Sequence, residues 1–84
     1  MKLSFDSKYF KQYIRDSNHV HKSVPVTYQA FKIDGKKYFQ IDCYSKNIDI
    51  DKIGPSKQSS HKLQFDKENA IKFISLLKKE LDIL

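Results

Sequence analysis

Lysines and aromatic residues recur together in the middle of the chain, between residues 31 and 62. A lysine ammonium group that neutralises a phosphate releases counterions, and the face of an aromatic ring stacks on an unpaired base. Side chains of both kinds on one surface therefore favour binding of single-stranded DNA or RNA over duplex. The residues that we expect to contribute are Phe31, Lys32, Lys36, Lys37, Tyr38, Tyr44, Lys46, Lys57 and Lys62.

The kind of cation bears on sequence specificity. Arg15 is the only arginine among the 16 basic residues. A guanidinium group reads a guanine edge with two hydrogen bonds, whereas an ammonium group acts as a point charge on phosphate. The composition therefore predicts nucleic-acid binding with low sequence specificity.

The excess positive charge lies before the C-terminal segment. The net charge is +6. Residues 1–62 hold 12 basic and 6 acidic residues, and residues 63–84 hold four basic and four acidic residues. This asymmetry favours a basic face set against a neutral helix, as expected of a protein that binds a polyanion. A lysine-rich surface that only keeps the protein in solution is the alternative.

Three histidines and one cysteine are the residues most able to ligate a transition metal or act as a nucleophile. A closed zinc site needs paired cysteines or histidines at both ends of a loop. His19, His21, Cys43 and His61 do not follow that pattern. A thiol that faces a core behaves as a small hydrophobe. We therefore expect no metal ion, no cofactor and no cysteine chemistry.

A cluster of aspartates raises the possibility of an enzyme. Asp42, Asp49 and Asp51 could hold a divalent cation in a small nuclease. Such sites usually add further carboxylates and a lysine on rigid strands. Asp49 and Asp51 fall in a polar stretch, where aspartate favours turns. We therefore expect a binding protein and not an enzyme.

A β-hairpin is the element that must position the aromatic residues. Residues 26–33 and 37–45 are rich in β-branched and aromatic residues, and they flank Asp34-Gly35, a strong signal for a two-residue turn. This register pairs Phe31 with Tyr38 on a face that also carries Thr27, Gln29, Gln40 and Asp42. Tyr44 continues that face.

The other hairpin face is mostly apolar and is expected to pack on a helix. It carries Val26, Tyr28, Ala30, Phe39, Ile41 and Cys43, with Lys32 opposite Lys37 near the turn. An outward face needs no aromatic residues, so the rings of the first face indicate a stacking platform or an interface. Packing of these rings under the N-terminal segment is an equally weighted alternative.

The C-terminal segment predicts a helix over residues 67–84. Asp66 suits its N-cap, Glu68 its positive first turn, and Lys78 and Lys79 its negative end. One apolar stripe runs along it: Ala70, Phe73, Ile74, Leu77, Leu81 and Leu84. Leu76 and Ile83 lie beside the stripe and would either widen it or begin a dimer contact.

The remaining segments give weaker patterns. Residues 59–65 alternate as a further strand, and residues 46–58 form a long polar loop around Gly54-Pro55. Ser7 could cap a short N-terminal helix that ends near Asp16. Its apolar face would be Tyr9, Phe10, Tyr13 and Ile14.

These elements predict a single α+β domain over residues 1–84. An antiparallel sheet of three to four strands, within residues 24–65, would pack on the helix of residues 66–84, and residues 1–22 would form an N-terminal segment. A chain this short buries a small core, so help from a partner is plausible. One cysteine, no signal peptide and no apolar run of about 20 residues indicate a cytoplasmic protein without a membrane span.

The order of hairpin, long loop, short strand and terminal helix over residues 28–81 resembles the positive cofactor four family of transcriptional coactivators and its bacterial relatives. The matching residues are Gly35-Lys36, Ile41-Asp42, Gly54-Pro55-Ser56-Lys57, Lys62-Leu63 and the segment from Lys67. The chain departs from the family where Ala70 replaces an aromatic residue, Ser60 a glycine and Cys43 an arginine.

The resemblance implies a homodimer whose helices pair and whose hairpins bind single-stranded DNA. Carried over to this sequence, it implies contacts from Lys36, Lys37, Tyr38, Tyr44, Lys57 and Lys62. The alternative function is a protein-binding inhibitor or adaptor of phage or mobile-element origin that acts on a nucleic-acid enzyme. Phe31, Tyr38 and Tyr44 would then be its interface anchors.

Overall fold

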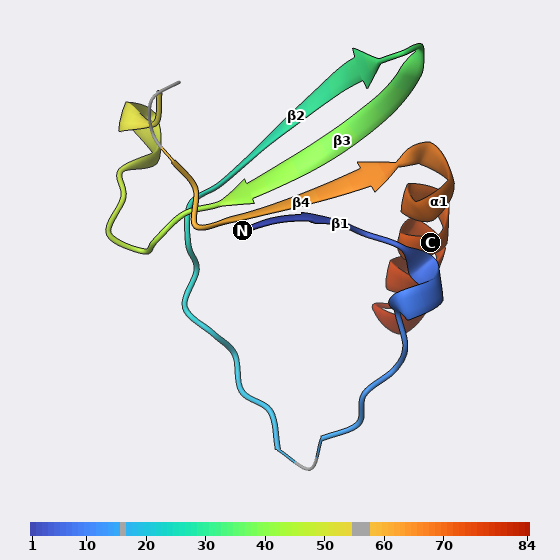
Figure 1. Ribbon diagram of the computed structural model, residues 1–84. Coiled ribbons are helices and arrows are strands. Elements are labelled where there is room, and N and C mark those ends of the chain that lie inside the picture. Colours follow the sequence, from blue (N-terminus) through green and yellow to red (C-terminus); the bar gives the residue numbers. More distant parts are fainter. Residues whose placement is uncertain (16, 55–57) are drawn as a thin grey trace.

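The computed structural model describes residues 1–15, 17–54 and 58–84 (Figure 1). The described residues form one four-stranded sheet and a C-terminal helix, which confirms the α+β class. Two short 3-10 turns, Ser7–Tyr9 and Ile50–Lys52, lie outside the sheet. The strands and helix are β1 (Lys2–Ser4), β2 (Val26–Ile33), β3 (Lys36–Cys43), β4 (His61–Asp66) and α1 (Lys67–Glu80).

The hairpin of β2 and β3 has the register that the sequence predicts. Its eight pairs run from Val26 opposite Cys43 to Ile33 opposite Lys36. The two turn residues have positive φ angles, 53° at Asp34 and 80° at Gly35. A turn of this kind matches the right-handed twist of the strands, which is why Asp-Gly is favoured there.

The sheet is mixed, with the strand order β1-β4-β3-β2. β4 pairs antiparallel with β3, so that Phe39 lies opposite Phe65. β1 pairs parallel with β4, with Lys2 opposite Lys62. This parallel edge strand was not expected, because three residues are too few to display the alternation that identifies a strand.

The C-terminal helix begins where the sequence predicts and ends four residues earlier. The Asp66 carboxylate accepts a hydrogen bond from the Asn69 backbone N–H at 2.9 Å, as an N-cap does. At the other end, Asp82 takes a left-handed φ of 54° and the Ile83 N–H donates to the Lys78 carbonyl at 2.9 Å. This C-terminal motif ends the helix. No helix in the described ranges has the length and hydropathy needed to span a membrane.

Four phenylalanines cluster where α1 meets the end of the sheet, around the buried Phe65, and Phe10 is still 45% exposed. Phe5, Phe10, Phe65 and Phe73 come from separate parts of the chain, and their ring centroids lie 5.0–5.8 Å apart. Such edge-on and tilted arrangements are favourable for aromatic rings. In Figure 1 the helix lies under this end of the sheet, so most of the hairpin extends beyond it.

The predicted N-terminal helix is wrong. Only Ser7–Tyr9 is helical, as a 3-10 turn that Asp6 caps, and residues 10–15 have no regular structure. A segment of about ten residues is shorter than the 12–15 that an isolated helix needs. The Phe10 ring packs on Phe5 and Phe73, which favours this irregular path. Asp16, its expected end, lies outside the described residues.

Candidate functional site

One face of the sheet is polar, and it lies opposite the face that α1 covers. We call it the polar face. The strand registers place alternate residues of all four strands on it. These are Lys2, Ser4, Thr27, Gln29, Phe31, Tyr38, Gln40, Asp42, Lys62 and Gln64.

Phe31 and Tyr38 form a stacked pair at the hairpin end of the polar face. Their ring centroids are 5.9 Å apart and the ring planes differ by 25°. Both residues are half-buried, so the rings retain access to solvent. The hairpin therefore brings these two predicted residues together as a small platform of the kind on which a base stacks.

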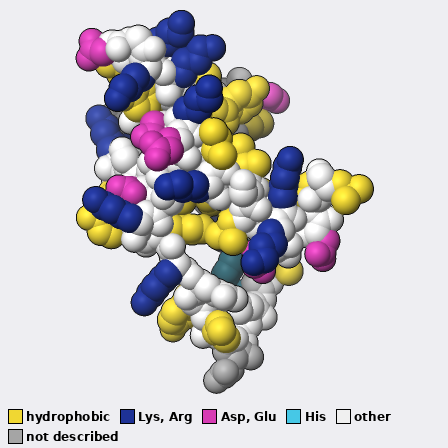
Figure 2. Space-filling model, turned by 90° about the vertical axis from the view of Figure 1, so that its right-hand side faces the viewer, with side chains coloured by type: hydrophobic (Ala, Val, Ile, Leu, Met, Phe, Trp, Pro, Cys, Tyr) yellow, Lys and Arg dark blue, Asp and Glu magenta, His cyan; other side chains and the backbone are white. Residues whose placement is uncertain are grey.

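Of the three predicted lysines at the hairpin tip, only Lys36 shares the face of this platform. Lys36 lies two residues before Tyr38 on the polar face, whereas Lys32 and Lys37 pair on the opposite face. All three also line a cavity of about 480 Å3 between the tip and the start of α1. Figure 2 shows Lys and Arg side chains gathered over this end of the molecule, with Asp and Glu among them.

Tyr44 continues the polar face as predicted, beside Thr27, but it is buried and is not part of the platform. It is only 6% exposed, and its hydroxyl lies 3.2 Å from Thr27 Oγ1. The Tyr44 N–H donates to the Pro25 carbonyl at 3.0 Å, so the strand alternation continues one residue past β3. Gly54 of the following loop lines one cavity with it. A buried ring cannot stack on a base.

The other predicted lysines differ in their setting. Lys46 is exposed in the loop after β3. Lys62 lies on the polar face, half-buried, within a hydrogen-bonded network. Lys57 lies outside the described residues.

Asp42 is the centre of that network. It is 8% exposed, and its Oδ2 accepts a hydrogen bond from Lys62 Nζ at 2.7 Å. Its Oδ1 accepts from Gln40 Nε2 at 2.8 Å, and the Ser59 hydroxyl lies 3.5 Å from Oδ2. Gln40 Oε1 in turn accepts from Gln64 Nε2 at 3.3 Å.

The network keeps the Asp42 carboxyl ionised. Burial by itself raises the pKa of this group, but hydrogen bonds from Lys62 and Gln40 and the positive charge of Lys62 outweigh burial. The pKa of Asp42 therefore lies below its ordinary value. At neutral pH the carboxylate is an acceptor only, which determines the orientation of the groups bound to it.

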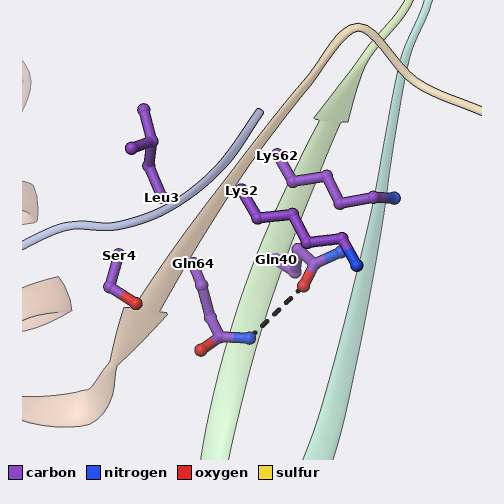
Figure 3. A pocket seen from close by; sticks show the side chains of 6 residues that line it. All are labelled: Lys2, Leu3, Ser4, Gln40, Lys62 and Gln64. Carbon is purple, nitrogen blue, oxygen red and sulfur yellow. Dashed lines mark hydrogen bonds between the residues drawn. The ribbon is translucent and has the colours of Figure 1, made fainter.

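Lys2 and Lys62 lie next to each other on β1 and β4 and line a cavity of about 280 Å3 with Gln40 and Gln64 (Figure 3). The two lysine side chains extend in the same direction across β3. Sequence reasoning missed Lys2 and Gln64 as site residues. Pairing β4 with β3 would have placed Gln64 beside Gln40, whereas the strand of Lys2 is too short to recognise.

The opposite face of the sheet and α1 enclose an apolar groove of about 370 Å3. Phe39, Ile41, Phe65, Ala70, Phe73, Ile74 and Leu77 line it. Ile74 is 50% exposed and Leu77 43%, so the predicted stripe is only partly covered. Hydrophobic side chains are visible at the surface in Figure 2.

The aspartates of the nuclease alternative do not form a site. Asp42 is paired with Lys62, and the Asp49 carboxylate accepts from the Asp51 N–H at 3.0 Å, as the cap of its own 3-10 turn. In the part of the chain that the structure describes, no three His, Cys, Asp or Glu side chains are grouped as metal ligands.

No protein-family model, no curated protein and no solved structure matches the chain significantly.

Proposed function

We propose that this protein binds single-stranded nucleic acid on its polar face, with low sequence specificity and as a homodimer. The stacked pair of Phe31 and Tyr38 carries the proposal. Two rings that retain access to solvent, with Lys36 on the same sheet face, suit an unpaired base and its phosphate. Paired bases in a duplex would not offer their faces to these rings.

Charge supports a polyanionic partner. The chain carries a net charge of +6, and on the polar face Lys36 lies at the hairpin tip and Lys2 on the β1 edge. These charges attract a phosphate backbone from a distance and hold it along the sheet. The single cysteine accords with a cytoplasmic setting.

A second copy of the chain is the occupant that we propose for the apolar groove. Large apolar side chains are exposed on both sides of it, and a monomer of this size gains little from so small a core. A two-fold axis would place the stripe of one α1 in the groove of the other protomer, and both would be covered at once. The resemblance to the positive cofactor four family supports the same arrangement.

Binding is tested by comparing two tyrosines on opposite faces of the hairpin. Tyr38→Ala removes half of the platform, whereas Tyr28→Ala removes an exposed ring from the other face. With a labelled oligothymidylate at low salt, Tyr38→Ala is expected to raise the Kd at least about five-fold, as for the loss of one stacked base. Tyr28→Ala should leave it within about two-fold, provided that the solution mass is unchanged. Equal effects of the two variants would contradict the proposal.

The dimer is tested by sedimentation equilibrium. Leu77→Glu puts a charge into the groove, and Ser75→Glu puts the same charge on the exposed side of α1, away from the apolar stripe. The unaltered protein and Ser75→Glu should sediment as dimers, and Leu77→Glu as a monomer. A monomeric unaltered protein would overturn this part of the proposal.

A protein-binding inhibitor or adaptor is the second candidate function. The exposed side chains of Tyr13, Ile14 and Val20, in the segment that precedes β2, favour it because isolated large apolar groups of this kind anchor protein interfaces. In that case Tyr13→Ala would abolish capture of a protein partner without changing affinity for oligonucleotides.

A further inference from the structure

The hydrogen bonds to Asp42 orient the donor groups of Lys62 and Gln40 on the polar face. Asp42 accepts from Lys62 with one carboxylate oxygen and from Gln40 with the other. The Lys62 ammonium has three N–H bonds, of which Asp42 takes one. The Gln40 amide has two, of which Asp42 again takes one. Donor hydrogens of both side chains therefore remain available, on either side of one carboxylate.

The Gln40 amide cannot turn over to present its oxygen instead. Its nitrogen faces an ionised carboxylate, which only accepts, and its oxygen accepts from Gln64 Nε2 at 3.3 Å (Figure 3). A reversed amide would set two oxygens against each other at Asp42 and two N–H groups against each other at Gln64. The pair of Lys62 and Gln40 is thus a donor pair at neutral pH.

The charge at this point favours a neutral acceptor over a phosphate. Lys62 and Asp42 are 2.7 Å apart, so their charges cancel. A phosphate that approached the Lys62 ammonium would be repelled by the Asp42 carboxylate, which is already bound to that ammonium. Lys2, next to Lys62 on β1, has no acidic partner among the described residues and is the better phosphate contact.

Among the bases, guanine best matches a pair of donors that includes a lysine, because its adjacent acceptors O6 and N7 are the commonest base target of lysine and arginine. Adenine replaces one of these acceptors by an amino donor. Cytosine has an amino donor at the corresponding edge, and its own adjacent acceptors, N3 and O2, lie on the Watson–Crick edge, so tighter binding of d(AC) than of d(GT) would contradict a guanine contact. Thymine has a single acceptor, O4, beside its methyl group. We infer that Lys62 and Gln40 read one guanine of the bound strand, while a neighbouring base stacks on Tyr38, two residues from Gln40 on the same face.

This inference rests on the proposed function and gives it one position of base preference. Its test uses two repeating DNA oligonucleotides of about 12 nucleotides, within the range that single-strand binding folds cover. d(GT) and d(AC) repeats have the same length, charge and proportion of purines, so stacking and phosphate contacts are matched. The d(GT) repeat should bind about five-fold more tightly or better, as for one specific base contact. A d(GT) repeat with 7-deazaguanine, which lacks the N7 acceptor, should lose most of that advantage.

Two glutamines on the same row of the sheet give the matched variants. Gln40→Ala removes one donor, whereas Gln29→Ala removes the amide directly opposite it on β2. Gln40→Ala should bring the ratio of the two affinities close to one, and Gln29→Ala should preserve it. The 7-deazaguanine probe needs no variant and remains decisive if Gln40→Ala does not fold.

The outcomes separate the inference from the proposed function. Tight, salt-sensitive binding with equal affinity for d(GT) and d(AC) would overturn the guanine contact and leave the proposed function intact. A preference that survives 7-deazaguanine or Gln40→Ala would also overturn it. Failure to bind any oligonucleotide would overturn both.

Discussion

The Nζ of Lys62 lies 2.7 Å from Oδ2 of Asp42, across the pairing of β3 and β4, and this ion pair anchors the polar face. Asp42 is nearly buried and Lys62 is about 29% exposed in its side chain, so neither group is fully solvated. The same carboxylate orients Gln40. The ion pair therefore has two roles: it stabilises the pairing of β3 with β4, and it orients the side chains that we propose to contact a base.

Removal of Lys62 should destabilise the fold. Lys62→Met keeps the length of the side chain and leaves the Asp42 carboxylate without its charged partner. The expected loss is about 1–3 kcal/mol in the free energy of unfolding, the cost of an unpaired buried polar group. Urea denaturation measures it.

The control is Lys46→Met, an exposed lysine in a loop, which should change stability by less than about 0.5 kcal/mol. The double variant Lys62→Met/Asp42→Leu should recover much of the loss, because apolar residues often replace a buried ion pair without cost. Equal losses for Lys62→Met and Lys46→Met would show that the ion pair does not stabilise the sheet.

Acid should weaken the protein through Asp42 and Asp66. The backbone N–H and side-chain amide of Asn69 hold the pKa of Asp66 below its ordinary value of 3.8, and the pKa of Asp42 is lowered as described. Both carboxyls bind protons less readily in the folded protein than in the unfolded chain. Their contribution to stability is therefore fully present above about pH 4 and is lost as the pH falls through the lower, folded pKa values.

Urea denaturation at a series of pH values measures this dependence. In Asp66→Asn, the new side chain is an equally good N-cap but does not titrate in this range. The variant should lose less stability between neutral pH and about pH 3 than the unaltered protein. An unchanged acid dependence would contradict the role given to the Asp66 carboxylate.

Gly35 should be required for the hairpin and Gly54 should not. A Cβ added at either glycine meets no atom within 4 Å, so packing does not distinguish them. Only Gly35 has a left-handed φ, 80°. Gly35→Ala should cost about 1 kcal/mol through backbone strain, and Gly54→Ala should be close to neutral. Thermal unfolding of the two variants checks the difference, and equal melting temperatures would contradict it.

The hairpin and the helix start were predictable because their signals are local. Asp34-Gly35 determines the turn, and the turn determines every pairing from Val26 to Cys43. Asp66 as N-cap and the apolar stripe of α1 are equally local. The pairing of Phe31 with Tyr38 followed directly from the turn.

The missed features depend on contacts between distant segments. β1 is recognisable only once β4 is in place beside it, and Lys2 joins the site by that pairing. Tyr44 keeps its predicted face but is buried there, and Gly54 of the following loop lines one cavity with it. The irregular path of residues 10–15 accords with the packing of Phe10 on Phe73, a contact that periodicity within the segment cannot reveal.

The dependence of binding on salt tests the central claim most directly. A labelled oligothymidylate is titrated with the unaltered protein at several salt concentrations, and the Kd is followed by fluorescence anisotropy. If lysines of the polar face neutralise phosphates, the logarithm of the association constant should fall linearly with the logarithm of salt concentration, by about 0.7 for each phosphate contacted. No binding at low salt, or an affinity that does not change with salt, would contradict the account.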